Sequence, residues 1–200
     1  MARSKRISKT PKKVEHAIIG VDPGGAFCGW GVFFADGEII NYLESGTWNL
    51  KRRRLEGAGM QLLRLDAYLS DVIKEYRDMG YVVCLVFEEI RFHGEGNPID
   101  AAHVYGNITG QIMKTCEDYG VPYRGIMPGT SRKLATGNGA MTKDEVREFL
   151  ESAYTNGKKL NSADKKITRG KNKGTTEKLF DESDALCIAL AHIVDMKWAE

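Results

Sequence analysis

The stretch IIGVDPGG, residues 18–25, joins an apolar strand to an abrupt polar end. Its run from Ala17 to Val21 is typical of a short strand that is covered on both faces. The carboxylate of Asp22 follows at once, and the next three residues, Pro-Gly-Gly, favour a turn. A second run, YVVCLVF at 81–87, also ends in acid, at Glu88 and Glu89. The repetition indicates a sheet that carries carboxylates at the ends of its strands.

The other elements follow an α/β order. A hairpin is predicted over 30–34 and 38–43, with Asp36 and Gly37 in its turn. A strand is predicted at 122–127. Helices are predicted over 55–79 and 97–119, from Thr142 onward, where Thr142 and Glu145 form a capping box, and in the closing DESDALCIALAHIV. The apolar stripe of the first helix consists of Leu55, Leu62, Leu65, Leu69, Val72, Ile73 and Tyr76.

The remaining segments predict connections and a fold class. The glycine-rich segment 128–141 is expected to be a loop, and the polar segment 155–178 a loop or a disordered arm. Strand, hairpin, helix, strand, helix, strand and helices together predict a mixed five-stranded sheet flanked by helices. The small residues Ala102, Gly106 and Gly110 follow one face of the helix at 97–119. They indicate a close approach there, either by the sheet of the same domain or by a partner subunit.

Composition limits the class of protein. The chain has 200 residues, which suits one domain, at 14–200, preceded by a flexible arm at 1–13. No apolar run reaches the roughly 20 residues that a membrane span needs, and the charged N-terminal segment, with no apolar stretch behind it, is not expected to act as a secretory signal. The four cysteines are widely spaced, which is typical of reduced thiols in a cytoplasmic protein rather than of a zinc site.

The charge is distributed unevenly. The net charge is only +2, but residues 1–13 carry six basic side chains and no acid. Residues 155–178 form a basic insertion with eight basic side chains against two acids, and KRRR at 51–54 adds a third cluster. An acidic body with basic segments indicates a polyanionic partner, and the third cluster favours nucleic acid.

Two further acids open the closing helix. Asp181 and Asp184 are three residues apart, so they lie on one face near the positive end of the helix dipole. Two carboxylates about 4 Å apart repel by roughly 4 kcal/mol at an effective dielectric constant of 20. If the strand-end acids and these two converge, they therefore need cations. Oxygen ligands suit Mg²⁺ or Mn²⁺, and a pair of such ions is a common device for phosphodiester hydrolysis.

At this point the chain resembles the RuvC-type Holliday-junction resolvases of the RNase H-like superfamily, from about residue 16 to 195. IIGVDPGGAFCGWGVF is similar to their first strand and hairpin, LVFEEI to the strand of their second acid, and DESDALCIALAH to their closing helix. The long basic segments look more like a phage or viral branch of that family. The resemblance implies an RNase H-like sheet and a crossover junction endonuclease.

The same resemblance implies roles for individual residues. Two Mg²⁺ ions, with Mn²⁺ as a substitute, are expected on Asp22, Glu88, Asp181 and Asp184. Lys143 is expected to act at the scissile phosphate, which agrees with its place at a helix start. Substrate contacts are expected from Lys133, Arg132, Arg91 and Phe92, although Phe92 follows the second acid one residue later than the family's aromatic.

The expected substrate is a four-way DNA junction, which has near two-fold symmetry and therefore suits a homodimer with two active sites. The helix at 97–119 is the candidate interface, and the cytoplasm of a bacterium or a phage-infected cell is the expected location.

Several alternatives stay open. Glu89 could replace Glu88 as a ligand, and the enzyme could cut flaps, forks or RNA–DNA hybrids. It could also be an idle DNA-binding module or, least in keeping with its length, an ATP-binding protein of the actin and sugar-kinase superfold.

Overall fold

The computed structural model describes residues 14–57, 59–90, 99–160, 164–166, 176–178 and 180–198, with the backbone alone for 164–166 and 176–178. The predicted N-terminal arm at 1–13 and the predicted contact residues Arg91 and Phe92 lie outside the described residues.

A mixed five-stranded sheet forms the centre of the molecule, in the order β3-β2-β1-β4-β5. Its strands are β1 (His16–Asp22), β2 (Phe27–Ala35), β3 (Ile40–Asn49), β4 (Val82–Glu88) and β5 (Tyr123–Ile126). The hairpin pairs β2 antiparallel to both of its neighbours, whereas β1, β4 and β5 run parallel. The predicted fold class is confirmed.

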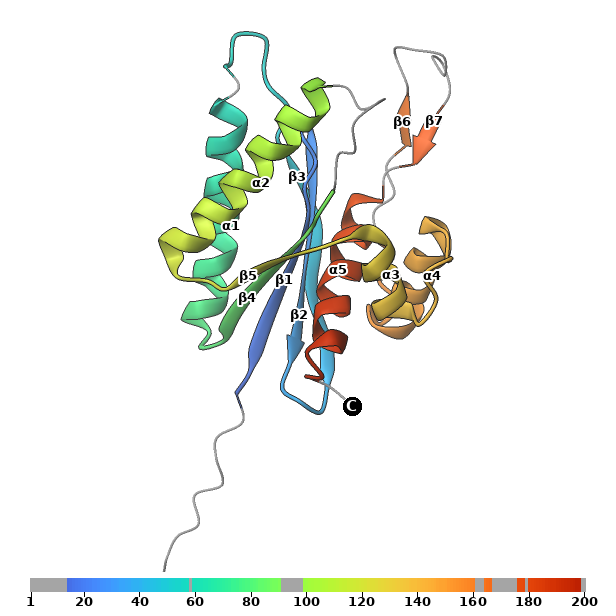
Figure 1. Ribbon diagram of the computed structural model, residues 1–200. Coiled ribbons are helices and arrows are strands. Elements are labelled where there is room, and N and C mark those ends of the chain that lie inside the picture. Colours follow the sequence, from blue (N-terminus) through green and yellow to red (C-terminus); the bar gives the residue numbers. More distant parts are fainter. Residues whose placement is uncertain are drawn as a thin grey trace, which may run out of the picture.

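Helices cover both faces of this sheet (Figure 1). The first face carries α1 (Gly59–Asp78) and α2 (Ile99–Tyr119), which pack on Ile19 and Val21 of β1. The opposite face carries α3 (Pro128–Thr136), α4 (Lys143–Ala153) and α5 (Asp181–Asp195), and Ile18 points into their core. This alternation explains why β1 is apolar at nearly every position. None of the helices in the described ranges is both long and apolar enough to cross a bilayer.

Two local expectations were wrong. Residues 128–136 form α3 rather than a loop, because Pro128 suits the first turn, Ser131 and Ala135 are buried, and Gly137 ends the helix at φ 76°. The first helix begins at Gly59 rather than at 55, so Leu55 is not part of its buried stripe and is 97% exposed.

The basic insertion is not wholly irregular. It contains β6 (Asp164–Lys166) and β7 (Thr176–Lys178), which pair antiparallel and apart from the main sheet. The prediction of a loop or disordered arm was therefore wrong for these residues. A ladder of this kind satisfies backbone groups without burying apolar side chains, so hydrophobic periodicity does not reveal it.

Candidate active site

The two strand-end acids meet at one edge of the sheet. Asp22 is the last residue of β1 and Glu88 the last residue of β4. The strands are parallel neighbours, with Val21 opposite Phe87, so their carboxyl ends lie side by side. The two carboxyl groups lie near enough for the charge of Glu88 to raise the pKa of Asp22. This edge is where α/β sheets commonly place their sites.

Close packing of α5 brings the second pair of acids to the same edge. Asp22 pairs with Gly29 of β2, and a Cβ at Gly29 would lie 1.8 Å from the backbone oxygen of Asp181. A Cβ at Gly20 would likewise lie 2.0 Å from the backbone oxygen of Ala185. The helix backbone therefore rests directly on these glycines. The sequence analysis missed both, although GxDPG and CGWG place them in strands, where a glycine signals close approach.

Burial and mutual repulsion raise pKa values among these acids. Burial raises the pKa of Asp22 well above its ordinary value, and Glu88, Asp184 and Asp181 raise it further. Burial also raises the pKa of Glu88 and that of Asp184. Among the described residues, however, no three Asp, Glu, His or Cys side chains are already arranged around a single metal position.

Lys143 supplies a positive charge at this edge. Thr142 and Glu145 form the predicted capping box at the start of α4, and this fixes the first turn that carries Lys143. Its Nζ donates a hydrogen bond to Oδ2 of Asp184. Burial alone would lower the pKa of Lys143, but Asp184, Asp22 and Glu88 raise it on balance. The ammonium therefore stays charged and offsets part of the carboxylate repulsion.

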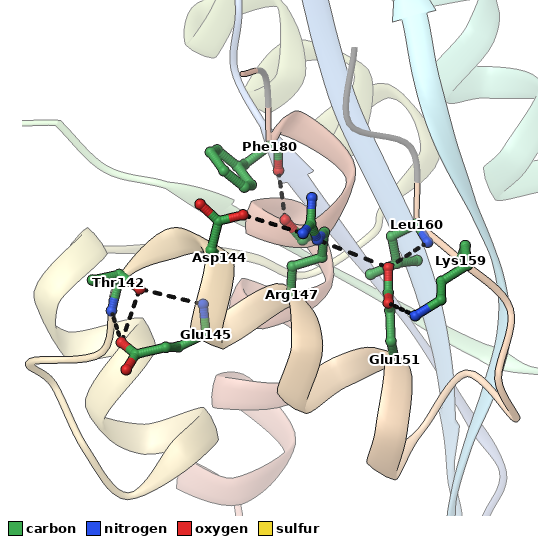
Figure 2. Close-up of polar contacts among 9 residues, drawn as sticks. Thr142, Asp144, Glu145, Arg147, Glu151, Lys159, Leu160 and Phe180 are labelled. Atoms are coloured by element: carbon green, nitrogen blue, oxygen red, sulfur yellow. Dashed lines mark hydrogen bonds and ion pairs between the residues drawn. The ribbon is translucent and has the colours of Figure 1, made fainter. Parts of the chain in front are cut away.

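The helix α4 also contacts the first residues of the basic insertion and the residue that precedes α5 (Figure 2). Glu151 is buried and accepts hydrogen bonds from Lys159 Nζ at 2.7 Å and from the backbone N–H of Leu160 at 3.0 Å. Arg147 is paired with Asp144 at 3.1 Å, and its guanidinium lies 5.7 Å from the ring centre of Phe180. Because Phe180 directly precedes α5, α4 is tied to the entry of the insertion and to the start of the acid-bearing helix.

The remaining described residues that were predicted to bind DNA or metal are Arg132, Lys133 and Glu89, and they differ in their exposure and contacts. Arg132 lowers the pKa of Glu88 and of Asp184 through its charge, and its Nη1 donates to the carbonyl of Met141 at 3.2 Å. Lys133 is exposed on α3. The alternative ligand Glu89 donates its N–H to Ile126, and its side chain lies against Gly125 of β5.

Two side chains that the sequence analysis did not single out hold the acid-bearing segments in place. The hydroxyl of Tyr105 donates to the carbonyl of Glu88 at 2.6 Å and accepts from the N–H of Ile90 at 2.8 Å. Glu182 is buried between Asp181 and Asp184 and accepts a 2.5 Å hydrogen bond from Ser45 of β3. The sequence offered one signal for Glu182, a third acid directly after Asp181 at the start of an apolar helix, whereas Tyr105 gave none beyond its place on an apolar face.

Comparison with known proteins gives a consistent picture. The family model of the crossover junction endodeoxyribonuclease RuvC matches residues 18–165. Relatives of that name in Anaeromyxobacter sp. (strain Fw109-5) and Histophilus somni are each 26% identical over 175 residues, which is 88% of this chain and 71% and 78% of theirs.

Solved structures agree on the fold. Thermus thermophilus RuvC in complex with Holliday junction substrate superposes with a TM-score of 0.68 at 21% identity, covering 90% of this chain and 94% of that one. The yeast mitochondrial Holliday junction resolvase gives a TM-score of 0.52 at 14% identity, covering 94% and 81%. With almost three quarters of its length matched by the family model, the chain belongs to the RuvC family of crossover junction endodeoxyribonucleases.

Proposed function

We propose that this protein is a metal-dependent endonuclease that resolves four-way DNA junctions by hydrolysing two opposed phosphodiester bonds. The observation that carries the proposal is the meeting of Asp22, Glu88 and the start of α5 at one edge of an RNase H-like sheet, in a chain of the RuvC family. The domain in question is residues 14–200, including the basic insertion at 155–178. We place it in the cytoplasm of a bacterium or a phage-infected cell.

The donor set fits hard divalent cations. Asp22, Glu88, Asp181 and Asp184 offer only carboxylate oxygens, which suit Mg²⁺ and, as a substitute, Mn²⁺. The raised pKa of Asp22 supports this assignment, since burial and the neighbouring carboxylates disfavour its charged form unless a cation is present. We assign two ions to these four residues. Such ions supply an activated water and stabilise the leaving oxygen in phosphodiester hydrolysis.

Other residues of the chain bind the phosphate and the DNA or position the carboxylates. Lys143, beside Asp184, offers its ammonium to the scissile phosphate, at a helix start where backbone N–H groups also favour phosphate. Arg132, whose charge acts on Glu88 and Asp184, and the exposed Lys133 beside it on α3 bind the DNA strand that enters the site. Tyr105 positions Glu88 through its hydrogen bond to the Glu88 carbonyl, and Glu182 positions the start of α5 through its hydrogen bond with Ser45. We retain Arg91 and Phe92, outside the described residues, as DNA contacts after β4.

We propose a homodimer as the working form. Two opposed nicks require two active sites, and a two-fold dimer matches a near two-fold junction. The exposed face of α2 supports this assignment, because in the described part of the chain no atom outside the adjoining turns of α2 would lie within 4 Å of a Cβ at Gly106 or Gly110. The sheet of the same domain therefore does not explain these glycines, and a second copy of α2 can approach closely there.

The test compares four labelled substrates in Mg²⁺: a four-way junction, a matched linear duplex, a three-way fork and an RNA–DNA hybrid. Paired symmetric nicks confined to the junction are expected. Asp22→Asn is expected to abolish cleavage and retain junction binding, since it removes a metal ligand and no basic contact. Asp71→Asn, on the exposed side of α1, makes the same charge change and should cut at the parental rate.

Two outcomes would contradict the proposal. Equal cutting of forks or hybrids would make the protein a broader nuclease of the same chemistry. Tight junction binding without cleavage in Mg²⁺ or Mn²⁺ would leave only a DNA-binding module.

A further inference from the structure

The connection between β3 and α1 lies at the same edge of the sheet as the acids. In Figure 1 it projects at the end of the molecule where α2 and α5 begin. The N–H of Leu50 donates to the carbonyl of Ala26 at 2.9 Å, and Gln61 of α1 donates to the carbonyl of Gly25. These contacts fasten the connection to the segment that directly follows Asp22.

This connection presents a dense positive charge, which we call the basic loop, residues 51–54. All four of its side chains, Lys51, Arg52, Arg53 and Arg54, are exposed. Together with Ala26, Glu56 and Gln61 they line an open hollow of about 540 Å³. A surface of this composition is suited to a polyanion rather than to an apolar ligand.

The one acid in the hollow does not cancel this charge, because other groups already use it. Glu56 accepts hydrogen bonds from the side chain of Arg64 and from the backbone N–H of Arg53 at 2.8 Å. Arg64 also donates to the carbonyl of Lys51 at 3.0 Å, so the ion pair braces the loop from within. The side chain of Arg53, 86% exposed, reaches Glu56 only at 3.9 Å.

The loop backbone is therefore held in shape while its cations face outward. Leu50, fully buried, anchors one end, and Arg64 with Glu56 anchors the other. Lys51 is partly fixed too, with its Nζ 4.4 Å from the ring centre of Phe27. A preformed loop loses less entropy when it binds than a free basic tail does.

A second hollow continues from the loop toward α2. Arg52 and Gln61 line it together with Leu62, Val104, Asn107 and Ile108. A third, lined in part by Pro23, Gly25 and Tyr105, continues toward the end of β4. The basic loop is thus the outer end of a series of hollows that runs past the segment following Asp22.

We propose that the basic loop binds the backbone phosphates of a duplex arm of the junction, at a site separate from the carboxylate centre. The inference rests on the proposed function, because it assigns the loop to the same substrate. Arginine suits this contact, since its planar guanidinium binds phosphate through two parallel hydrogen bonds. Phosphates are common to all duplexes, so the loop adds affinity for junctions and for linear DNA alike.

The experiment measures binding in EDTA, where cleavage does not interfere, across a range of salt concentrations. The variant R52A/R53A/R54A removes three cations of the loop and leaves Lys51 on Phe27. The matched control, K74A/R77A/K197A, removes three cations at the opposite end of the sheet, where α1 and α5 finish.

The loop variant should lose about 10- to 100-fold in affinity at moderate salt. Its slope of log affinity against log salt should fall by about 2 to 3, since each phosphate contact contributes about 0.9. The control should change affinity by less than about 3-fold. An equal loss in both variants would show a general charge effect and overturn the assignment, as would an unchanged slope in the loop variant.

A chemical measurement on the unmutated protein gives an independent result. Arg52, Arg53 and Arg54 should react with phenylglyoxal in free protein and be protected by bound junction DNA, as mass spectrometry of the peptides would show. Unprotected arginines in a saturated complex would overturn the assignment.

Failure of the loop and failure of the proposed function are distinguishable. If the unmutated protein nicks the junction in Mg²⁺ while the loop variant keeps its salt slope, the loop assignment alone is wrong. If the unmutated protein neither binds nor cuts the junction, both are wrong.

Discussion

At the scale of single residues, the site depends on how four carboxylates are kept close together. Burial and their mutual repulsion raise the pKa of Asp22, and the cation of Lys143 works against that repulsion. Lys143 is bound to Asp184, whose side chain is only 15% exposed. A metal ion bound as proposed would therefore compete with the lysine for the same carboxylate oxygen.

This competition predicts that Lys143→Met changes the cleavage rate and the metal requirement in different ways. The cleavage rate at saturating metal should fall by about 100-fold or more, because a positive charge beside the reacting phosphate is lost. The Mg²⁺ concentration that gives half of the maximal rate should stay the same or decrease, because Asp184 is released from its ion pair. A metal titration of the single-turnover rate measures both quantities.

Two comparisons make the result specific. Asp184→Asn should shift the metal requirement upward, since it removes a ligand. Lys133→Met, on the exposed side of α3, should raise the DNA concentration required and leave the rate at saturation close to that of the parent. An increased metal requirement in Lys143→Met would contradict the competition.

At the scale of elements, the position of α5 decides whether two acids on a helix can join two acids on strands. The helix lies against Gly20, Gly29 and Gly31, and no side chain separates its backbone from Gly20 or Gly29. On the other side, Phe180 and Asp184 contact α4 through Arg147 and Lys143. The acids of α5 are thus fixed by backbone packing as much as by their own side chains.

A pair of glycine substitutions tests this packing. Gly29→Ala places a Cβ 1.8 Å from the backbone oxygen of Asp181, so the first turn of α5 must move. Gly31→Ala places a Cβ 2.4 Å from Cδ2 of Leu186, which is a side-chain atom rather than the helix backbone. Each overpacked variant should lose about 1–3 kcal/mol of stability in denaturant unfolding.

Their activities should differ far more than their stabilities. Gly29→Ala should reduce cleavage by about 100-fold, because small displacements of reacting groups have effects of that size. Gly31→Ala should keep cleavage within a few-fold of the parent. Equal activities in two folded variants would show that the backbone contact at Gly29 does not position the acids.

At the scale of the whole molecule, the proposed paired cleavage requires two active sites that face one junction. The exposed face of α2 is the surface that we propose pairs two copies, and its glycines are open in the described structure. Gly106→Glu introduces bulk and charge there, and among the described residues outside the adjoining turns of α2 no atom lies within 4 Å of the new Cβ. The substitution therefore acts on association and spares the fold of the single chain.

The expected result is a dimer for the parent and a monomer for Gly106→Glu in sedimentation velocity at micromolar concentration. The variant should unfold at the same or slightly higher denaturant concentration once association is accounted for, since glycine in a helix costs about 1 kcal/mol relative to alanine. Met79→Glu, at the exposed end of α1, serves as a charge control and should remain dimeric. A monomeric parent, or a dimeric Gly106→Glu, would contradict an interface on α2.

The order of elements and the candidate acids could be read from the sequence, for a local reason. Buried strands show as continuous apolar runs, and a carboxylate directly after such a run is visible without any knowledge of tertiary contacts. Asp22 and Glu88 were found in this way. The acid pair on α5 was found from its three-residue spacing at a helix start, and the capping box that positions Lys143 from its own local pattern. The roles assigned to them stay predictions.

Features that depend on distant segments could not be read in this way. The helix α3 forms within a glycine-rich segment because it packs on α5, and Leu55 lies outside its helix because the chain turns at the basic loop. The glycines beneath α5, the hydrogen bond from Ser45 to Glu182 and the bracing of Glu56 by Arg64 join residues far apart in the chain or in different elements. The sequence by itself determined which residues are candidates for the chemistry, whereas only the tertiary structure decided how the backbone of α5 meets the sheet, because close packing depends on the shapes of both partners.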